Sequence, residues 1–338
     1  MSTPITALPK DFKDPNKWAD YWELRCISSE EKTFSRDDML NLLKDQSIDR
    51  PSNYSPEDPR KYLGSKNGEA DEQTADIVNT WWEMLDGRNI FFGNTYYPFF
   101  IDGTTLGLRP RLTAVQKIYL GCLFASNLDY ASKHTADLTT WFEGLSAEIT
   151  KGILPDSRLA RCYRFGKGAY SKPARYKGNI QTKLEKLGHD LHLSFRSDFE
   201  RDCKKDPNYL HKKSTGDKGL DIVAWIEFDD SEALSPLYLG QCACGANWEG
   251  KQFEAHSVVW KDIFQFSVEP LTILYIPRSY RHSNGEFWHR SSTHNLIFFD
   301  RYRILKLANQ QKPIGSLLHS TVYETFKHFQ SLNLSYVD

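Results

Sequence analysis

Two oxygen-bearing side chains, Asp221 and Gln241, stand inside apolar segments that are typical of neighbouring β-strands. Burying a carboxylate in an apolar interior is costly unless a partner or a cation compensates the charge. Carboxylate and amide oxygens are ligands that Mg²⁺ accepts, so the pair predicts a cation site. The alternative for Asp221 is that it caps the turn formed by residues 217–219.

The segments around this pair predict an α/β domain. Residues 179–191 should form an amphipathic helix, because Ile180, Leu184 and Leu187 recur on one face. Apolar runs predict strands over residues 191–195, 220–228, 236–244, 271–277 and 295–304, with a second helix over residues 247–264. Apolar strands flanked by helices are typical of a sheet that is covered on both faces.

The order of these elements resembles the core of the PD-(D/E)xK, or restriction-endonuclease-like, nuclease superfamily. Glu185 lies on the first helix, Asp221 precedes one strand, and Gln241 takes the place of the motif acid in the next. The resemblance covers about residues 175–305 and implies a restriction-endonuclease-like mixed sheet flanked by helices. It implies that Asp221 and Gln241 bind Mg²⁺ or Mn²⁺, and that Glu185 binds a metal-coordinated water or a second cation. Because Gln241 is uncharged, affinity for Mg²⁺ should be weaker than in a three-carboxylate site.

The motif lysine of this superfamily is missing, since the position two residues after Gln241 is Ala243. An alanine cannot orient or deprotonate a nucleophile. We expect Lys251, at the start of the following helix, to replace it, and Lys218 is a second candidate. The alternative for Lys251 is an ordinary exposed lysine. The expected catalytic residues are therefore Glu185, Asp221, Gln241 and Lys251.

Charge is unevenly distributed along the chain, although the net charge is only -1. Residues 1–150 have an excess of acidic side chains, and the remaining residues have an excess of basic ones. This asymmetry is typical of a nucleic-acid-binding domain joined to a non-binding one, although two solvated surfaces of unequal charge would also produce it. The candidate DNA-binding residues are Lys212, Lys213, Lys218, Arg278 and Arg281.

The first part of the chain predicts a mostly helical domain over residues 1–154. Helices are expected over residues 36–43, 75–85, 114–131 and 135–153, a loop over residues 50–67, and a hairpin in the aromatic run 90–101. Pro155 ends the last of these helices. The second, nuclease-like domain is therefore expected over residues 155–338.

Composition excludes a membrane-spanning segment, because no apolar run approaches the roughly 20 residues that such a segment needs. The N-terminus lacks the basic and apolar segments of a secretion signal, so we expect a cytoplasmic protein. The six cysteines contain no Cys-x-x-Cys pair and are expected to be reduced thiols.

The resemblance implies a metal-dependent DNA endonuclease, a hydrolase of bacterial restriction or antiphage defence that acts with companion proteins, as a monomer or an oligomer. The missing lysine leaves an alternative, which is a catalytically inactive nuclease-fold subunit that binds nucleic acid or scaffolds a defence complex. A third class is a protein-interaction subunit that uses the helical half and makes no contact with nucleic acid.

Overall fold

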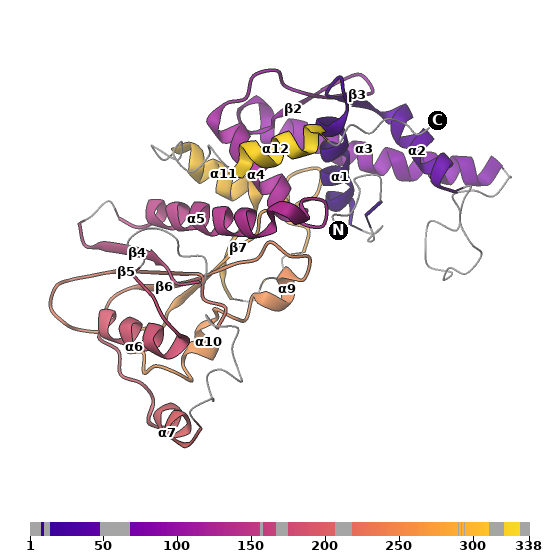
Figure 1. The fold of residues 1–338 in the computed structure, drawn as a ribbon. Coiled ribbons are helices and arrows are strands. Elements are labelled where there is room, and N and C mark those ends of the chain that lie inside the picture. Colours follow the sequence, from indigo (N-terminus) through magenta and orange to yellow (C-terminus); the bar gives the residue numbers. More distant parts are fainter. Residues whose placement is uncertain are drawn as a thin grey trace. The chain divides into compact units, whose positions relative to one another are not determined.

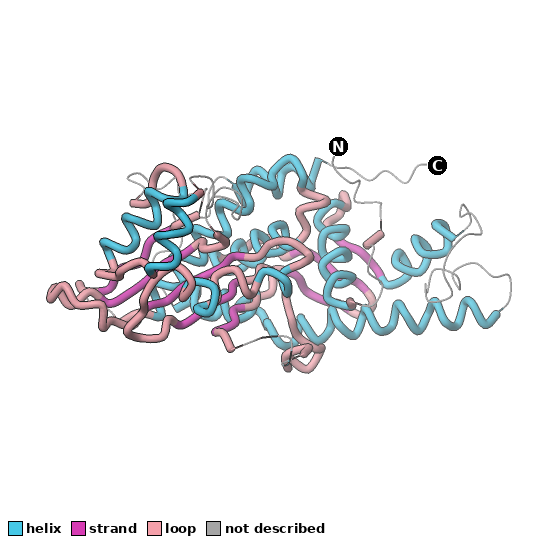
Figure 2. The backbone as a smooth tube through the Cα atoms, turned by 90° about the horizontal axis from the view of Figure 1, so that it is seen from below, coloured by secondary structure: helices cyan, strands magenta, loops and turns pink. Residues whose placement is uncertain are grey.

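The computed structural model describes residues 8–9, 14–47, 68–155, 158–166, 175–206, 218–289, 291, 293, 295–310 and 321–331. The chain forms two compact units, each assembled from separate segments of the sequence. The first comprises residues 1–134, 279–288 and 318–338, and the second comprises residues 135–278 and 289–317. Figure 2 shows helices and strands in the chain, which is therefore a mixed α/β protein, as expected.

The first unit combines helices with a small antiparallel sheet of order β1-β3-β2. Its last helix, α12, packs against α1 and α4, and Phe329 of α12 stacks on Phe124 at 4.9 Å between ring centroids. The elements are α1 (Pro15–Ser28), β1 (Thr33–Ser35), α2 (Arg36–Ser47), α3 (Gly68–Tyr96), β2 (Phe99–Asp102), β3 (Thr105–Leu108), α4 (Ala114–Ser126), the 3₁₀ turn Ser132–His134 and α12 (Thr321–Ser331).

A buried ionic network stabilises the helices of this unit. One guanidinium nitrogen of Arg88 lies 2.7 Å from a carboxylate oxygen of Asp20 and 2.7 Å from one of Glu23. The hydroxyls of Tyr97 and Tyr119 each donate to Glu23 at 2.9 Å. Buried charges require such partners, because an unpaired ion in the interior is strongly disfavoured.

The second unit is built on a five-stranded mixed sheet of order β4-β5-β6-β7-β8. The β4–β5 and β5–β6 pairs are antiparallel, whereas the β6–β7 and β7–β8 pairs are parallel. The elements are α5 (Thr135–Ile153), β4 (Ala160–Arg164), α6 (Ile180–Asp190), α7 (Ser197–Lys205), β5 (Ile222–Ile226), β6 (Leu237–Cys242), α9 (Trp248–Lys251), α10 (Ser257–Trp260), β7 (Leu271–Tyr275), β8 (Ile297–Phe299) and α11 (Arg301–Gln310).

Helices α5 and α6 cover the two faces of strands β4 to β6 (Figure 1). Asn179 caps α6 by accepting a hydrogen bond from the amide of Thr182 at 2.9 Å. The buried apolar side of α6 packs with alternate residues of β5 and β6, among them Val223 and Leu239. On the other face, the hydroxyls of Thr150 in α5 and Tyr275 in β7 lie 2.8 Å apart. The strand pattern of the sequence therefore gives a sheet covered on both faces, as expected.

Several elements differ from the sequence prediction. The division into units places α5 with the second unit and α12 with the first, instead of separating the chain near Pro155. The helix expected over residues 247–264 is two short helices, α9 and α10, and the side chain of His256 caps the second by accepting from the amide of Val258. The strand expected over residues 191–195 is a single bridge between Phe195 and Phe264. The expected strand 295–304 is β8 followed directly by α11.

Candidate functional site

Asp221 and Gln241 lie opposite each other at one end of the β5–β6 pair. The register pairs Ile222 with Gly240, so the next position along the two chains pairs Asp221 with Gln241. Residues directly opposite in an antiparallel pair point to the same face of the sheet. The sheet therefore brings together the two residues on which the predicted cation site depends.

Backbone contacts on both sides of Gln241 hold Asp221 in this position. The Asp221 Oδ2 atom accepts a hydrogen bond from the amide of Cys242 at 2.7 Å. Its own amide donates to the carbonyl oxygen of Gly240 at 2.9 Å. Asp221 is 8% exposed, and hydrogen bonds from amides favour the ionised form of a carboxyl group. The site therefore contains a buried carboxylate with a fixed orientation.

The Gln241 side chain carries a buried oxygen that can bind a ligand. Gln241 is 4% exposed, and its Oε1 atom has no hydrogen-bond partner among the described residues. Its Nε2 atom lies 3.5 Å from the carbonyl oxygen of Cys242, which is a long hydrogen bond. A buried acceptor without a donor costs about 1–3 kcal/mol. A cation at Oε1 would remove this cost.

Glu143 of α5 brings a second carboxylate to Asp221. A Cβ atom built on Gly166 would lie 3.0 Å from Oδ1 of Asp221 and 3.5 Å from Oε2 of Glu143, so both acids border the same small space. Arg164 forms an ion pair with Glu143 at 2.9 Å. Burial raises the pKa of the Cys242 thiol, and the charges of Asp221 and Glu143 raise it further, which agrees with this arrangement.

Glu185 does not take the position expected for the helix acid. It lies on the exposed side of α6, where its carboxylate accepts a hydrogen bond from the side chain of Gln181 at 3.0 Å. Glu185 follows a buried leucine, and consecutive helix positions point in different directions. The structure thus brings Glu143, and not Glu185, to Asp221.

The sequence contains a weak signal for Glu143 that the prediction did not use. Helix α5 buries Trp141, Phe142 and Leu145, and Glu143 is a partly buried acid within that run. The sequence prediction places this helix in the first domain, away from the expected site. The missing information was the tertiary position of the helix, which the local pattern does not contain.

Lys251 and Ala243 differ in solvent exposure. Ala243 is fully buried at the end of β6. Lys251 is the last residue of the short helix α9 and is partly exposed, and no hydrogen bond or ion pair of its ammonium group is recorded within the described ranges. The structure does not place Lys251 in contact with Asp221 or Gln241.

The candidate DNA-binding residues of the second unit have different environments. Lys212 and Lys213 lie outside the described residues. Lys218 is partly exposed, in a turn where it has a φ of 52°. Arg278 is only 8% exposed, and its guanidinium donates to the carbonyl oxygen of Gly245 at 3.4 Å. Arg278 therefore packs inside the unit instead of forming an exposed phosphate contact.

Arg281 belongs to the first unit and has a structural environment. Its guanidinium lies over the rings of Phe91 and Phe287, at 5.2 and 4.3 Å from their centroids. It also donates to the carbonyl oxygen of Gly285 at 2.8 Å. These contacts join the loop after residue 279 to α3, so they stabilise the fold.

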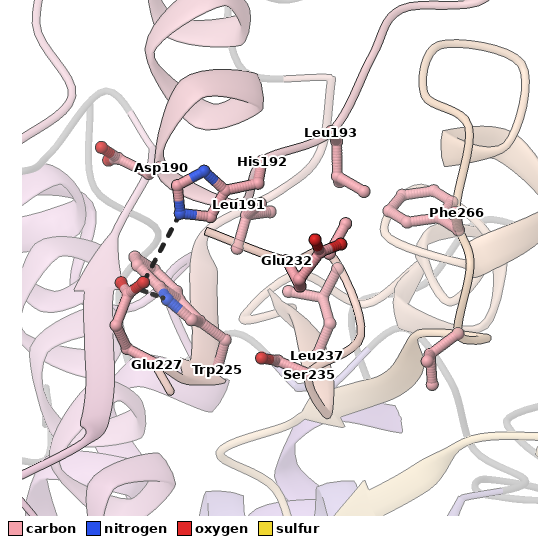
Figure 3. Close-up of a pocket in the computed structure, with 12 residues that line it drawn as sticks. Asp190, Leu191, His192, Leu193, Trp225, Glu227, Glu232, Ser235, Leu237 and Phe266 are labelled. Atoms are coloured by element: carbon pink, nitrogen blue, oxygen red, sulfur yellow. Dashed lines mark hydrogen bonds and ion pairs between the residues drawn. The ribbon is translucent and has the colours of Figure 1, made fainter. Parts of the chain in front are cut away.

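A separate pocket lies at the other end of β5 and β6, where Trp225 and Leu237 contribute to its wall (Figure 3). Glu227 contacts two other polar side chains of the pocket. Its carboxylate accepts a hydrogen bond from the indole of Trp225 at 3.1 Å and lies 3.6 Å from a ring nitrogen of His192. None of the predicted site residues lines it. Trp225, Glu227 and His192 bind one another, and the pocket gives no specific indication of chemistry.

The oxygens of this region are of the kind that a hard divalent cation binds. Asp221 and Glu143, which border Gly166, supply anionic oxygens, and Gln241, which lies opposite Asp221 in the strand register, supplies a neutral one. The structure contains no group of three or more His, Cys, Asp and Glu side chains suited to a metal, within the residues that it describes. A metal at this position would therefore need the Gln241 amide in addition to the two carboxylates.

Comparisons with family models, with curated proteins and with solved structures find no match to this chain. None of the described helices is long and apolar enough to cross a membrane. The function must therefore be argued from the site itself.

Proposed function

We propose that the second unit is a divalent-cation-dependent endonuclease that hydrolyses phosphodiester bonds in DNA. The observation that carries this proposal is the pair of carboxylates that border Gly166, those of Asp221 and Glu143, together with the buried amide oxygen of Gln241, the residue opposite Asp221, which has no partner among the described residues. Arg164 already pairs with Glu143, but a bound cation would lower the cost of burying the Asp221 carboxylate and of leaving the Gln241 oxygen without a donor. This donor set is the kind that metal-dependent phosphoryl transfer requires.

The order of elements in the second unit supports the proposal. Helix α5 precedes β4, β5 and β6, and the short helices α9 and α10 then lead to β7, which is parallel to β6. This order resembles a restriction-endonuclease-like core, in which an acid-bearing helix precedes the strands that carry the metal ligands. In this chain α6 and α7 stand between β4 and β5, so α5 corresponds to the acid-bearing helix.

The chain's own residues would divide the work as follows. When bound, a divalent cation would polarise a phosphoryl oxygen and lower the pKa of a coordinated water. The amide of Cys242 orients the Asp221 carboxylate, and Arg164 holds Glu143 through its ion pair. Gln241 contributes an oxygen without adding negative charge. The buried environment keeps these groups fixed, which reduces the reorganisation needed during the reaction.

The choice of DNA as substrate rests on the basic excess of the chain after residue 150 and on the resemblance. We further propose a role in restriction or antiphage defence in the cytoplasm, with companion proteins that supply recognition or activation. The second candidate function is a catalytically inactive subunit of the same fold that binds nucleic acid. The observation that favours this alternative is the buried Ala243 at the position of the motif lysine.

Cleavage assays with matched variants test the proposal. Glu143→Gln and Asp221→Asn each remove one anionic ligand, so both should reduce nicking of plasmid DNA in Mg²⁺ or Mn²⁺ by about 10²-fold or more. Glu148→Gln is the control, because Glu148 lies on the same helix but pairs with the exposed Lys151. Its cleavage rate should equal that of the wild type.

DNA binding separates the two candidate functions. Asp221→Asn should bind DNA as tightly as the wild type or more tightly, because a negative charge near the phosphates is gone. Wild-type protein that binds DNA but gives no cleavage with either metal, alone or with its companion proteins, would refute the endonuclease. DNA binding without cleavage would favour the second candidate function, a catalytically inactive subunit.

A further inference from the structure

Lys183 is a buried lysine whose ammonium group is bound to the backbone beside the candidate site. It is 5% exposed, and its Nζ donates to the carbonyl oxygen of Phe165 at 2.8 Å. The same nitrogen lies 5.4 Å from the centroid of the Phe165 ring. Burial of an ammonium ion is costly, so a lysine in this position needs compensating interactions or a function.

Two hydrogen bonds connect Lys183 to Asp221. The first is the bond from Lys183 to the Phe165 carbonyl, and the second is the bond from the Phe165 amide to the Asp221 carbonyl at 2.7 Å. The next residue, Gly166, borders the space between the carboxylates of Asp221 and Glu143. Lys183 therefore fixes the peptide that forms one side of this space.

We propose that Lys183 is a positioning residue of the nuclease site, and that it supplies the positive charge that Ala243 cannot. This inference rests on the proposed endonuclease function. Lys183 holds the carbonyl group of Phe165, the amide of Phe165 binds the backbone of Asp221, and the next residue, Gly166, borders the two carboxylates. Its charge opposes part of the negative charge that develops on a phosphoryl group.

The other cations near the site are less suited to this role. Arg164 is already paired with Glu143 at 2.9 Å, so its charge is largely neutralised. Lys251 is partly exposed at the end of α9, where water screens its charge. Lys183 combines burial with a direct link to the backbone partner of Asp221, and a buried charge acts through a lower effective dielectric.

The test compares four variants of the full chain in metal-binding, cleavage and thermal-unfolding assays. Lys183→Met removes the charge but keeps a similar apolar stem, and Lys183→Arg retains the charge. Lys186→Met is the matched control, because Lys186 lies three residues further along α6 with a side chain that is 41% exposed. Lys251→Met tests the alternative source of charge.

We expect Lys183→Met to cleave DNA at least about 10²-fold more slowly and to bind Mn²⁺ about fivefold more tightly at pH 8, since a repelling charge is removed. Lys183→Arg should recover part of the rate, whereas Lys186→Met and Lys251→Met should match the wild type in metal binding and cleavage, with Lys186→Met losing only the stability of its ion pair with Asp190. Simple loss of packing would not give tighter metal binding together with slower cleavage, because partial unfolding lowers both the metal affinity and the cleavage rate.

Each other outcome contradicts the inference in a recognisable way. Unchanged metal affinity in a folded Lys183→Met protein would overturn it, even if the wild type did not cleave DNA. Loss of cleavage only in Lys251→Met would assign the role to Lys251 and leave the endonuclease intact. A wild type that binds no Mn²⁺ would remove the proposed function together with this inference.

Discussion

A methyl group at Gly166 should block the candidate metal site without removing any of its ligands. A Cβ atom at this position would lie 3.0 Å from Oδ1 of Asp221 and 3.5 Å from Oε2 of Glu143. Magnesium binds oxygen at about 2.0–2.1 Å and requires a near-octahedral shell. The methyl group would occupy volume that the cation and its waters need, so Gly166→Ala should lower metal affinity by about 10²-fold, or about 2.7 kcal/mol.

The fold should tolerate this substitution better than the site does. Crowding against Asp221 costs about 1–3 kcal/mol, and Gly→Ala gains about 0.4–1 kcal/mol by restricting the unfolded chain. A net loss of 1 kcal/mol corresponds to a shift of about 2–4 °C in Tm for a domain of this size. Gly245→Ala is the control, because a Cβ atom there meets nothing within 4 Å.

Isothermal titration with Mn²⁺ and plasmid cleavage measure the two effects of Gly166→Ala. We expect the Gly166→Ala protein to be folded but to lose Mn²⁺ binding and plasmid cleavage, whereas Gly245→Ala should keep the metal affinity and cleavage rate of the wild type. A folded Gly166→Ala protein that binds Mn²⁺ with wild-type affinity would refute the reasoning, because the metal would then bind elsewhere. In that case the proximity of Asp221 and Glu143 would have a structural cause.

Two further predictions concern stability. Arg88→Met should destabilise the first unit by about 3–5 kcal/mol in urea unfolding, because it leaves Asp20 and Glu23 buried without their cation; a loss below 1 kcal/mol would contradict this. Burial opposes ionisation of Asp190, but hydrogen bonds from Arg175 and other donors outweigh this and lower its pKa. The stability that Asp190 contributes is therefore present above the unfolded-state pKa and is lost as the pH falls through the lower folded-state pKa. Asp190→Asn should unfold more easily than the wild type at pH 7, and this difference should disappear in acid.

The sequence predicts β5 to β8 of the second unit but misses β4, and it predicts these strands better than their tertiary partners. Asp221 and Gln241 stand inside apolar runs, and β5 and β6 form as neighbouring strands, as those runs predict. The carboxylate that a helix brings to Asp221 is harder to predict, since Glu185 and Glu143 both lie on predicted helices. The 3.6-residue period already placed Glu185 away from the face of Leu184, and this signal favoured the structure that is observed.

The domain boundary could not be read from local patterns. Helix α5 has an apolar side that could cover either unit, and Pro155 ends the helix without showing which unit it joins. Deleting the expected first domain, residues 1–154, would therefore remove Glu143 together with α5. The return of α12 to the N-terminal helices depends on contacts such as Phe329 with Phe124, which join distant segments. Such long-range packing has no local signature.

The two departures from the motif have a common electrostatic consequence. Gln241 removes one negative charge, and Ala243 removes one positive charge, so the net charge of the motif is retained. With Asp221 and Glu143 opposed by Arg164 and Lys183, the protein alone offers a cation little excess negative charge. The phosphates of DNA would supply the additional negative charge. Thermodynamic linkage then requires that the metal and DNA increase each other's affinity for the protein by the same factor. We expect Ca²⁺, used to prevent cleavage, to tighten DNA binding by about tenfold in the wild type and to have no effect in Glu143→Gln. Equal DNA affinity with and without the cation in the wild type would show that the site does not hold a metal in contact with the substrate.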